Sequence, residues 1–106
     1  MIDAMIVLVS CASREEAGKI AEVLVQERLA ACVNVVSSVE SCYRWEGKVG
    51  WDSEYLLVIK TTAGVLDRCR ERTLEIHGYD LPEFIAFKID AGSAPYLKWI
   101  DDSVES

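Results

Sequence analysis

The chain has 106 residues, of which 51% are hydrophobic and 27% are charged, a balance typical of one compact domain over residues 1–106 rather than of a disordered chain. Its formal net charge of −7 opposes binding to nucleic-acid phosphates and to anionic lipids, because such binding needs clustered Lys and Arg. No apolar segment is long enough for a membrane span, and no signal-like segment opens the chain, so we expect a soluble cytoplasmic protein.

The first two elements in chain order are a strand and a helix. Residues 5–10 are almost all aliphatic, which is typical of a central strand covered on both faces. Ser13 and Glu16 fit a capping box, in which the hydroxyl and the carboxylate each accept a hydrogen bond from a backbone N–H at a helix start. Apolar residues then recur at helical spacing, and this pattern predicts one buried helix face made of Ala17, Ile20, Ala21 and Leu24.

Two strand-like runs follow, both rich in Val, Tyr and Trp. They cover Cys32 to Trp45 and Val49 to Thr61, and a turn at residues 46–48 separates them. The sequence therefore predicts one long antiparallel hairpin.

The last third of the chain predicts a helix, a strand and a short helix. The first helix covers residues 63–76, with Thr62 as its N-cap and Gly78 as a left-handed residue beyond its end. Alternating side chains over residues 83–90 predict a strand, and residues 92–95 start the final helix. The order β-α-β-β-α-β-α predicts an α+β fold with the ferredoxin-like split βαβ plan and one added C-terminal helix.

The length of the hairpin indicates an oligomer. Each arm would extend ~45 Å at ~3.3 Å per residue, whereas a domain of this size has a radius of gyration of ~13 Å. The distal half carries Tyr43, Trp45 and Trp51, which a monomer would leave in water. We expect identical chains to pair these strand edges in a closed ring. The alternative is a hairpin that bends or bulges near residues 37–38 or at Gly50 and folds back onto its own sheet.

Few residues offer chemistry. His77 is the only histidine, and its place at a helix end can also be explained by the helix dipole. The four cysteines are widely spaced, so we expect reduced thiols and no zinc site, although a thiol and an imidazole together could bind copper. No close carboxylate pair, phosphate loop or nucleophile-base spacing is present, and we do not expect an enzyme.

Two charged residues lie beside apolar runs, where an unpaired charge is costly. Lys60 ends an apolar strand, and Glu83 follows Pro82. Either they flank a subunit interface and pair across it, or they are polar anchors of a cleft.

Five segments carry a family resemblance. They are ERLAACVN at residues 27–34, YRWEGK at 43–48, IKTT at 59–62, HGYDLPE at 77–83 and YLKWI at 96–100. In this order, and over nearly the whole chain, they closely resemble the CutA divalent-cation tolerance family.

The resemblance implies a tight homotrimer similar in architecture to the PII signalling proteins, with hairpins that extend across neighbouring subunits. It implies tolerance to divalent metals, notably copper, with no obligatory cofactor, and in some members a role in protein localisation. A trimeric signalling or scaffold module that binds a small molecule or a protein partner is the alternative. The candidate metal ligands are His77 and Cys11. The resemblance implies an intersubunit cleft, whose candidate residues are Tyr43, Trp45, Lys60, Tyr79, Pro82, Glu83 and Trp99.

The sequence departs from the family pattern at two positions. Gly78 stands where most members have proline. Val9 aligns with a copper-associated cysteine of some members, and Cys11 follows two residues later. A shift of two residues keeps the cysteine on the same face of the strand but moves it to another location.

Overall fold

The computed structural model describes residues 2–105. The expected element order is confirmed, with bounds that differ slightly from the sequence patterns. The elements are β1 (Ala4–Cys11), α1 (Arg14–Gln26), β2 (Cys32–Trp45), β3 (Lys48–Thr62), a 3-10 turn (Ala63–Val65) that continues into α2 (Leu66–Ile76), β4 (Ile85–Lys88) and α3 (Ala94–Ser103).

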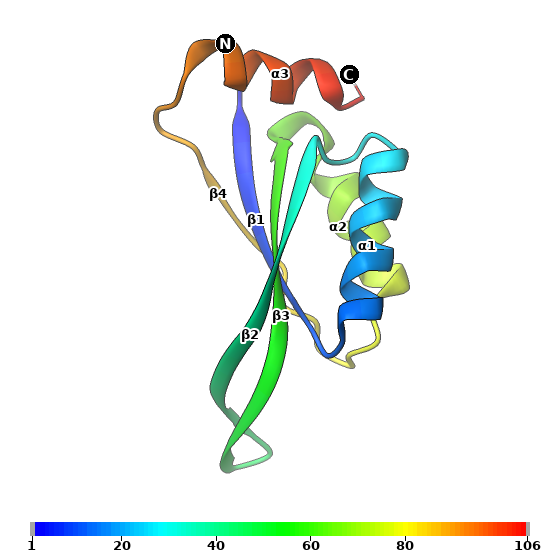
Figure 1. The fold of residues 1–106 in the computed structure, drawn as a ribbon, viewed down its shortest axis with the longest axis vertical. Coiled ribbons are helices and arrows are strands. Elements are labelled where there is room, and N and C mark those ends of the chain that lie inside the picture. The colour runs from blue at the N-terminus through cyan, green and yellow to red at the C-terminus, as the bar shows by residue number, and fades with distance from the viewer. Residues whose placement is uncertain (1, 106) are drawn as a thin grey trace.

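The four strands form one sheet in the order β2-β3-β1-β4, and every neighbouring pair is antiparallel. Because β3 lies between β1 and β2, the β1-α1-β2 unit is split in the way that the sequence predicted. The fold is therefore ferredoxin-like. Figure 1 shows α1 and α2 packed together on one face of the sheet, with α3 across the end of the sheet opposite the hairpin tip.

The core lies between the sheet and the two long helices. Val7 and Val9 of β1, Leu57 and Ile59 of β3, and Ile20 of α1 are fully buried there. Burying an aliphatic side chain of this size stabilises the fold by roughly 1.5–3 kcal/mol, so this layer is the main source of stability.

The other face of the sheet has no helical layer over it (Figure 1). Strand alternation places Ile6 and Leu8 there, opposite Phe87 and Ile85 of the edge strand β4. Phe87 is 51% exposed and Ile85 is 55% exposed. A broad apolar surface is thus left on the molecule.

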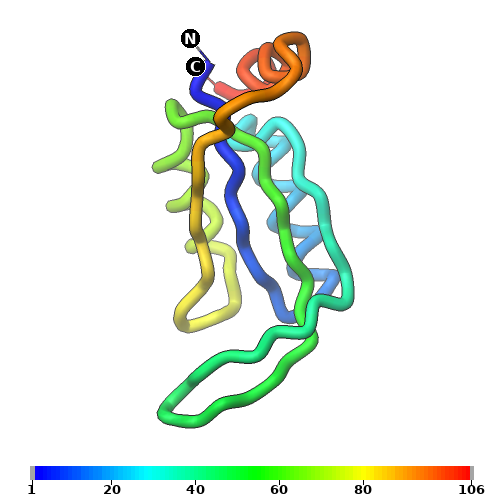
Figure 2. The backbone as a smooth tube through the Cα atoms, turned by 90° about the vertical axis from the view of Figure 1, so that its left-hand side faces the viewer, coloured from blue at the N-terminus to red at the C-terminus, as the bar shows by residue number. Residues whose placement is uncertain are grey.

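The hairpin is paired along its whole length, from Cys32 opposite Lys60 to Trp45 opposite Lys48. Glu46 and Gly47 both have positive φ, as a two-residue type I′ turn requires. Figures 1 and 2 show that the distal half extends beyond the helices, and the molecule is 44 Å long. A β-bulge lies between Val36 and Val39, where the alternative placed it, but the tip remains exposed and is not covered by its own sheet.

Three local expectations need correction. Gly78 does not have positive φ, because the backbone turns away in an extended conformation already at His77. Thr62 makes no side-chain capping bond, since a 3-10 turn precedes α2. The last strand has four residues instead of eight, because the ladder with β1 covers only Ile85–Lys88, and beyond it the Ile89 N–H donates to the Ala4 carbonyl at 3.0 Å.

No helix within residues 2–105 is long and apolar enough to span a membrane.

Candidate functional site

A pocket of about 510 Å³ lies between the distal hairpin and the segment that joins α2 to β4. Tyr43, Trp45, Asp52 and Glu54 line it from the hairpin. Residues 78–81 and Glu83 line the opposite wall, and Ser10, near the end of β1, contributes as well. The pocket therefore joins three segments that are far apart in the sequence.

The bulge in β2 decides which hairpin side chains face this pocket. Val36 pairs with Leu56, whereas Val39 pairs with Glu54, so β2 has one more residue than β3 at this point. Because side chains alternate along a strand, the extra residue moves the odd-numbered residues of β2 onto the face of Asp52 and Glu54. Tyr43 and Trp45 consequently face the pocket together with these two carboxylates.

Hydrogen bonds fix two of the pocket carboxylates. The Tyr43 hydroxyl donates to Asp52, and the Tyr79 hydroxyl donates to Glu54 Oε2 at 2.6 Å. The bond to Asp52 raises the pKa of Tyr43, and burial followed by the bond to Glu54 raises the pKa of Tyr79. Both hydroxyls therefore remain protonated donors at neutral pH.

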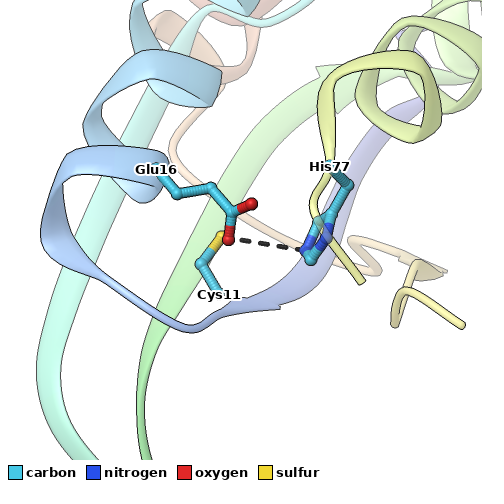
Figure 3. Close-up of side chains that lie close together, drawn as sticks. All are labelled: Cys11, Glu16 and His77. Atoms are coloured by element: carbon cyan, nitrogen blue, oxygen red, sulfur yellow. Dashed lines mark hydrogen bonds between the residues drawn. The ribbon is translucent and has the colours of Figure 1, made fainter. Parts of the chain in front are cut away.

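A second cluster lies directly beside the pocket. Figure 3 shows the side chains of Cys11, Glu16 and His77 pointing toward one another. One ligand atom of each lies within 4.8 Å of those of the other two. Cys11 ends β1, Glu16 lies in the first turn of α1, and His77 follows α2. The Cys11 Sγ to His77 Nε2 distance is 3.9 Å.

Backbone groups determine which ring nitrogen of His77 carries the proton. Its Nδ1 accepts a hydrogen bond from the Tyr79 N–H at 3.1 Å, so the proton is on Nε2, which lies 2.7 Å from the Ser10 carbonyl oxygen and donates to it. Burial, followed by the charges of Glu16 and Glu54, raises the pKa of the Cys11 thiol to about 12. The Cys11 thiol is therefore protonated at neutral pH.

Glu16 forms hydrogen bonds both at the start of α1 and with the pocket wall. The Ser13 hydroxyl accepts the Glu16 N–H at 3.1 Å, which is the predicted N-cap bond. The Glu16 carboxylate, in turn, accepts the N–H of Ala12 at 3.3 Å and that of Gly78 at 2.7 Å. A Cβ at Gly78 would lie 2.6 Å from Glu16 Oε2, so any other residue here would displace the Glu16 carboxylate from its present position.

The structure brings some of the expected residues together and leaves others apart. Tyr43, Trp45, Tyr79 and Glu83 line the pocket, and His77 and Cys11 lie next to each other. Pro82 lies in the same segment but does not line the pocket. Lys60 is on β3, where it donates to Asn34, and Trp99 is on α3, where its ring lies 5.4 Å from that of Tyr96.

Sequence reasoning missed several residues of the site, namely Ser10, Glu16 as a member of the histidine cluster, Asp52, Glu54 and Asp80. Asp52 and Glu54 did carry a usable signal, because they continue the alternation of Leu56 and Val58 along one face of β3. The other three carried none, since their position depends on contacts between distant segments.

Comparison with known proteins gives the family. The family described as "CutA1 divalent ion tolerance protein" matches residues 5–103. The chain belongs to this family. It is 44% identical over 98 residues to the divalent-cation tolerance protein CutA of Thermus thermophilus, which covers 92% of this chain and 95% of the relative. It is also 46% identical over 105 residues to the chloroplastic protein CutA of Arabidopsis thaliana.

Solved structures agree with this assignment. The divalent cation tolerance protein Cut A1 from Thermus thermophilus aligns with a TM-score of 0.94 at 42% identity, over 96% of this chain and 99% of that one. CutA1 from Oryza sativa aligns with a TM-score of 0.95 at 41% identity, over 98% and 95%. The chain spans only 58% of the Arabidopsis relative's length, so it corresponds to part of that protein.

Proposed function

We propose that this protein is a homotrimeric, non-enzymatic divalent-cation tolerance protein that binds copper or a related ion through His77, Cys11 and Glu16. The convergence of these three donors from three elements within 4.8 Å is the observation that carries the proposal. A thiolate and an imidazole suit copper and zinc, and a carboxylate completes a three-ligand set. The names of the CutA relatives in Thermus and other organisms agree with a role in cation tolerance.

Metal binding at this cluster must displace a proton. The Cys11 thiol is protonated at neutral pH, because its pKa is raised to about 12, and His77 Nε2 would have to release the Ser10 carbonyl. Since metal ligands bind in their deprotonated form, we expect the apparent affinity to rise with pH.

Titration calorimetry tests the metal proposal. Cu²⁺ is titrated into wild type, Cys11→Ser and His77→Gln, and Zn²⁺ is run in parallel because it cannot oxidise the thiol. We expect each variant to bind at least ~10-fold more weakly. Glu15→Gln, which removes a neighbouring acid outside the cluster, is the matched control and should bind like wild type. Identical isotherms for wild type and His77→Gln would exclude His77 as a ligand.

The trimeric state is supported by the uncovered apolar face of the sheet and by the exposed hairpin tip. A monomer would leave Ile85 and Phe87 of β4 and Trp51 of β3 in water. A cytoplasmic location remains a prediction, since the relatives include a chloroplastic protein and one described as periplasmic.

A second candidate function is favoured by the pocket. In this function the protein is a PII-like signalling or scaffold module that binds a small molecule or a protein partner in clefts that neighbouring subunits complete. The pocket beside the hairpin, with Tyr43, Trp45, Tyr79 and Glu83 in its lining, supports it. A thermal-shift screen of charged and neutral metabolites tests it, because a ligand that prefers the native state raises the melting temperature.

A further inference from the structure

The hairpin pocket has the size and the aromatic lining of a small-molecule site. Its volume of about 510 Å³ falls within the roughly 300–1,000 Å³ of typical ligand sites. Tyr43, Trp45 and Tyr79 contribute three rings. Tyr43 and Trp45 are each close to half exposed in the subunit, and both line the pocket.

The charge of the pocket has one sign. Asp52, Glu54, Asp80 and Glu83 line it, and its lining contains no Lys, Arg or His. None of these four carboxylates forms an ion pair within residues 2–105. The charges of the two walls therefore lack a cationic counterpart in the subunit.

Glu54 is the pocket carboxylate whose missing counter-charge costs the most free energy. It is only 9% exposed, and its described partner is the neutral Tyr79 hydroxyl. Burial of a carboxylate is expensive unless a positive charge compensates it. Burial and the nearby Glu54 also raise the pKa of Glu83, which is the response expected of a carboxyl among like charges.

We propose that this pocket binds a small aliphatic diamine or polyamine, with its ammonium groups between the carboxylates and its methylene chain against the rings of Tyr43, Trp45 and Tyr79. The inference rests on the second candidate function and names its ligand class. An ammonium group satisfies both parts of the lining, because it pairs with carboxylates and is attracted to aromatic faces.

Other ligand classes fit less well. A hydrated Mg²⁺ ion would use the carboxylates but not the rings, since it keeps several waters and binds through oxygen ligands. Nucleotides and other phosphates would be repelled by the four carboxylates, because no basic side chain of the subunit lines the pocket. A neutral ligand would leave Glu54 without a counter-charge.

The test compares two ligands with the same six-carbon chain, one ending in charged ammonium groups and the other in neutral hydroxyls. 1,6-Diaminohexane and 1,6-hexanediol are titrated into the full chain by calorimetry, with a chelator present so that the metal cluster plays no part. We expect the diamine to bind saturably and the diol to give no binding heat. Mg²⁺, which has the same charge as the diamine, is titrated separately in buffer without the chelator and is expected to bind weakly.

Variants locate the binding. Glu54→Gln keeps the Tyr79 bond but removes the charge and should weaken diamine binding ~10-fold or more, whereas Trp45→Leu should weaken it about threefold. Glu40→Gln is the matched control, because Glu40 lies on the opposite face of the same hairpin, bonded to Ser53. It should bind like wild type.

Three results would overturn the inference. They are binding of the diol as strong as that of the diamine, equal loss of binding in Glu40→Gln and Glu54→Gln, and tighter binding of Mg²⁺ with no effect of Trp45→Leu. If the thermal-shift screen finds an anionic or neutral ligand for the same pocket, the ligand class is wrong while the second candidate function stands. A pocket that binds nothing in either experiment removes both.

Discussion

Glu16 joins two segments of the chain at the scale of single side chains. It lies in the first turn of α1, yet its carboxylate accepts the N–H of Gly78, 62 residues away. Its partner segment carries His77, which belongs to the cluster with Cys11 and Glu16, and Tyr79, which lines the pocket. Occupation of the cluster by a metal would therefore compete with the bond that holds the pocket wall in place.

A double-mutant cycle tests this link. Gly78→Ala should lower the free energy of unfolding by about 1 kcal/mol, because the added Cβ displaces the Glu16 carboxylate and breaks its bond to the Gly78 N–H. In a Glu16→Ala background the same change should be neutral or slightly stabilising, since alanine reduces the freedom of the unfolded chain. Chemical denaturation at one protein concentration measures both. Equal effects in the two backgrounds would contradict the link.

Some residue-scale features could be predicted from the sequence and others could not. Ser13 was correctly predicted as the N-cap, because capping depends on residues within one turn. Gly78 was wrongly expected to be left-handed, because its φ is not positive and its N–H is instead bonded to the Glu16 carboxylate. No local pattern reveals a contact with a side chain 62 residues away.

At the scale of elements, the bulge in β2 is the feature that builds the pocket. Ser38 has φ 61°, a left-handed conformation that is costly for residues other than glycine, asparagine and aspartate. The strained residue lies in the bulge, and the bulge brings Tyr43 and Trp45 onto the face of Asp52 and Glu54. The aromatic lining of the pocket thus depends on one residue in the middle of a strand.

Substitutions at the bulge test this account. Ser38→Gly should leave the free energy of unfolding unchanged or raise it by up to ~1 kcal/mol, whereas Ser38→Val should lower it by about 1–2 kcal/mol, because a β-branched side chain tolerates positive φ poorly. Urea denaturation gives both values. Ser37→Val is the control, since Ser37 lies outside the left-handed region, and a loss equal to that of Ser38→Val would refute the explanation.

The hairpin itself could be predicted from the sequence, but which of its side chains face the pocket could not. Residues rich in Val, Tyr and Trp on both sides of Glu46 and Gly47 give a strong strand and turn signal, and the paired arms confirm it. A Ser-Ser pair carries no comparable signal for a bulge. Without the bulge, alternation would have placed Cys42 and Arg44 on the pocket face, so the carboxylates and the rings could not be assigned to one site from the sequence.

At the scale of the whole molecule, the sheet has a helical layer on one face only. The apolar residues of the uncovered face include Ile6 and Leu8 in the centre and Phe87 at the edge. β4 is also an open edge with unpaired backbone groups, to which a strand of another subunit can pair. These two features together account for the proposed homotrimer.

Light scattering coupled to size-exclusion chromatography tests the assembly. Wild type should have three times the subunit mass of 11.8 kDa. Phe87→Asp should lower the measured mass, because it places a charge in the buried centre of an interface. Leu74→Asp, at an exposed leucine of α2 on the helical layer, should keep the wild-type mass. A monomeric wild type would reject the trimer, and an unchanged mass of Phe87→Asp would reject the face of β4 as its interface.

The two chain ends lie at the opposite side of the molecule from the hairpin tip, as Figures 1 and 2 show, and the Glu105 N–H is held there by the Arg28 carbonyl. An affinity tag or a linker to a sensor surface joined at either end would therefore leave from the side remote from the pocket. Immobilised protein would present the aromatic and acidic lining to the solution, so amines in flow could be measured without the tether obstructing their entry.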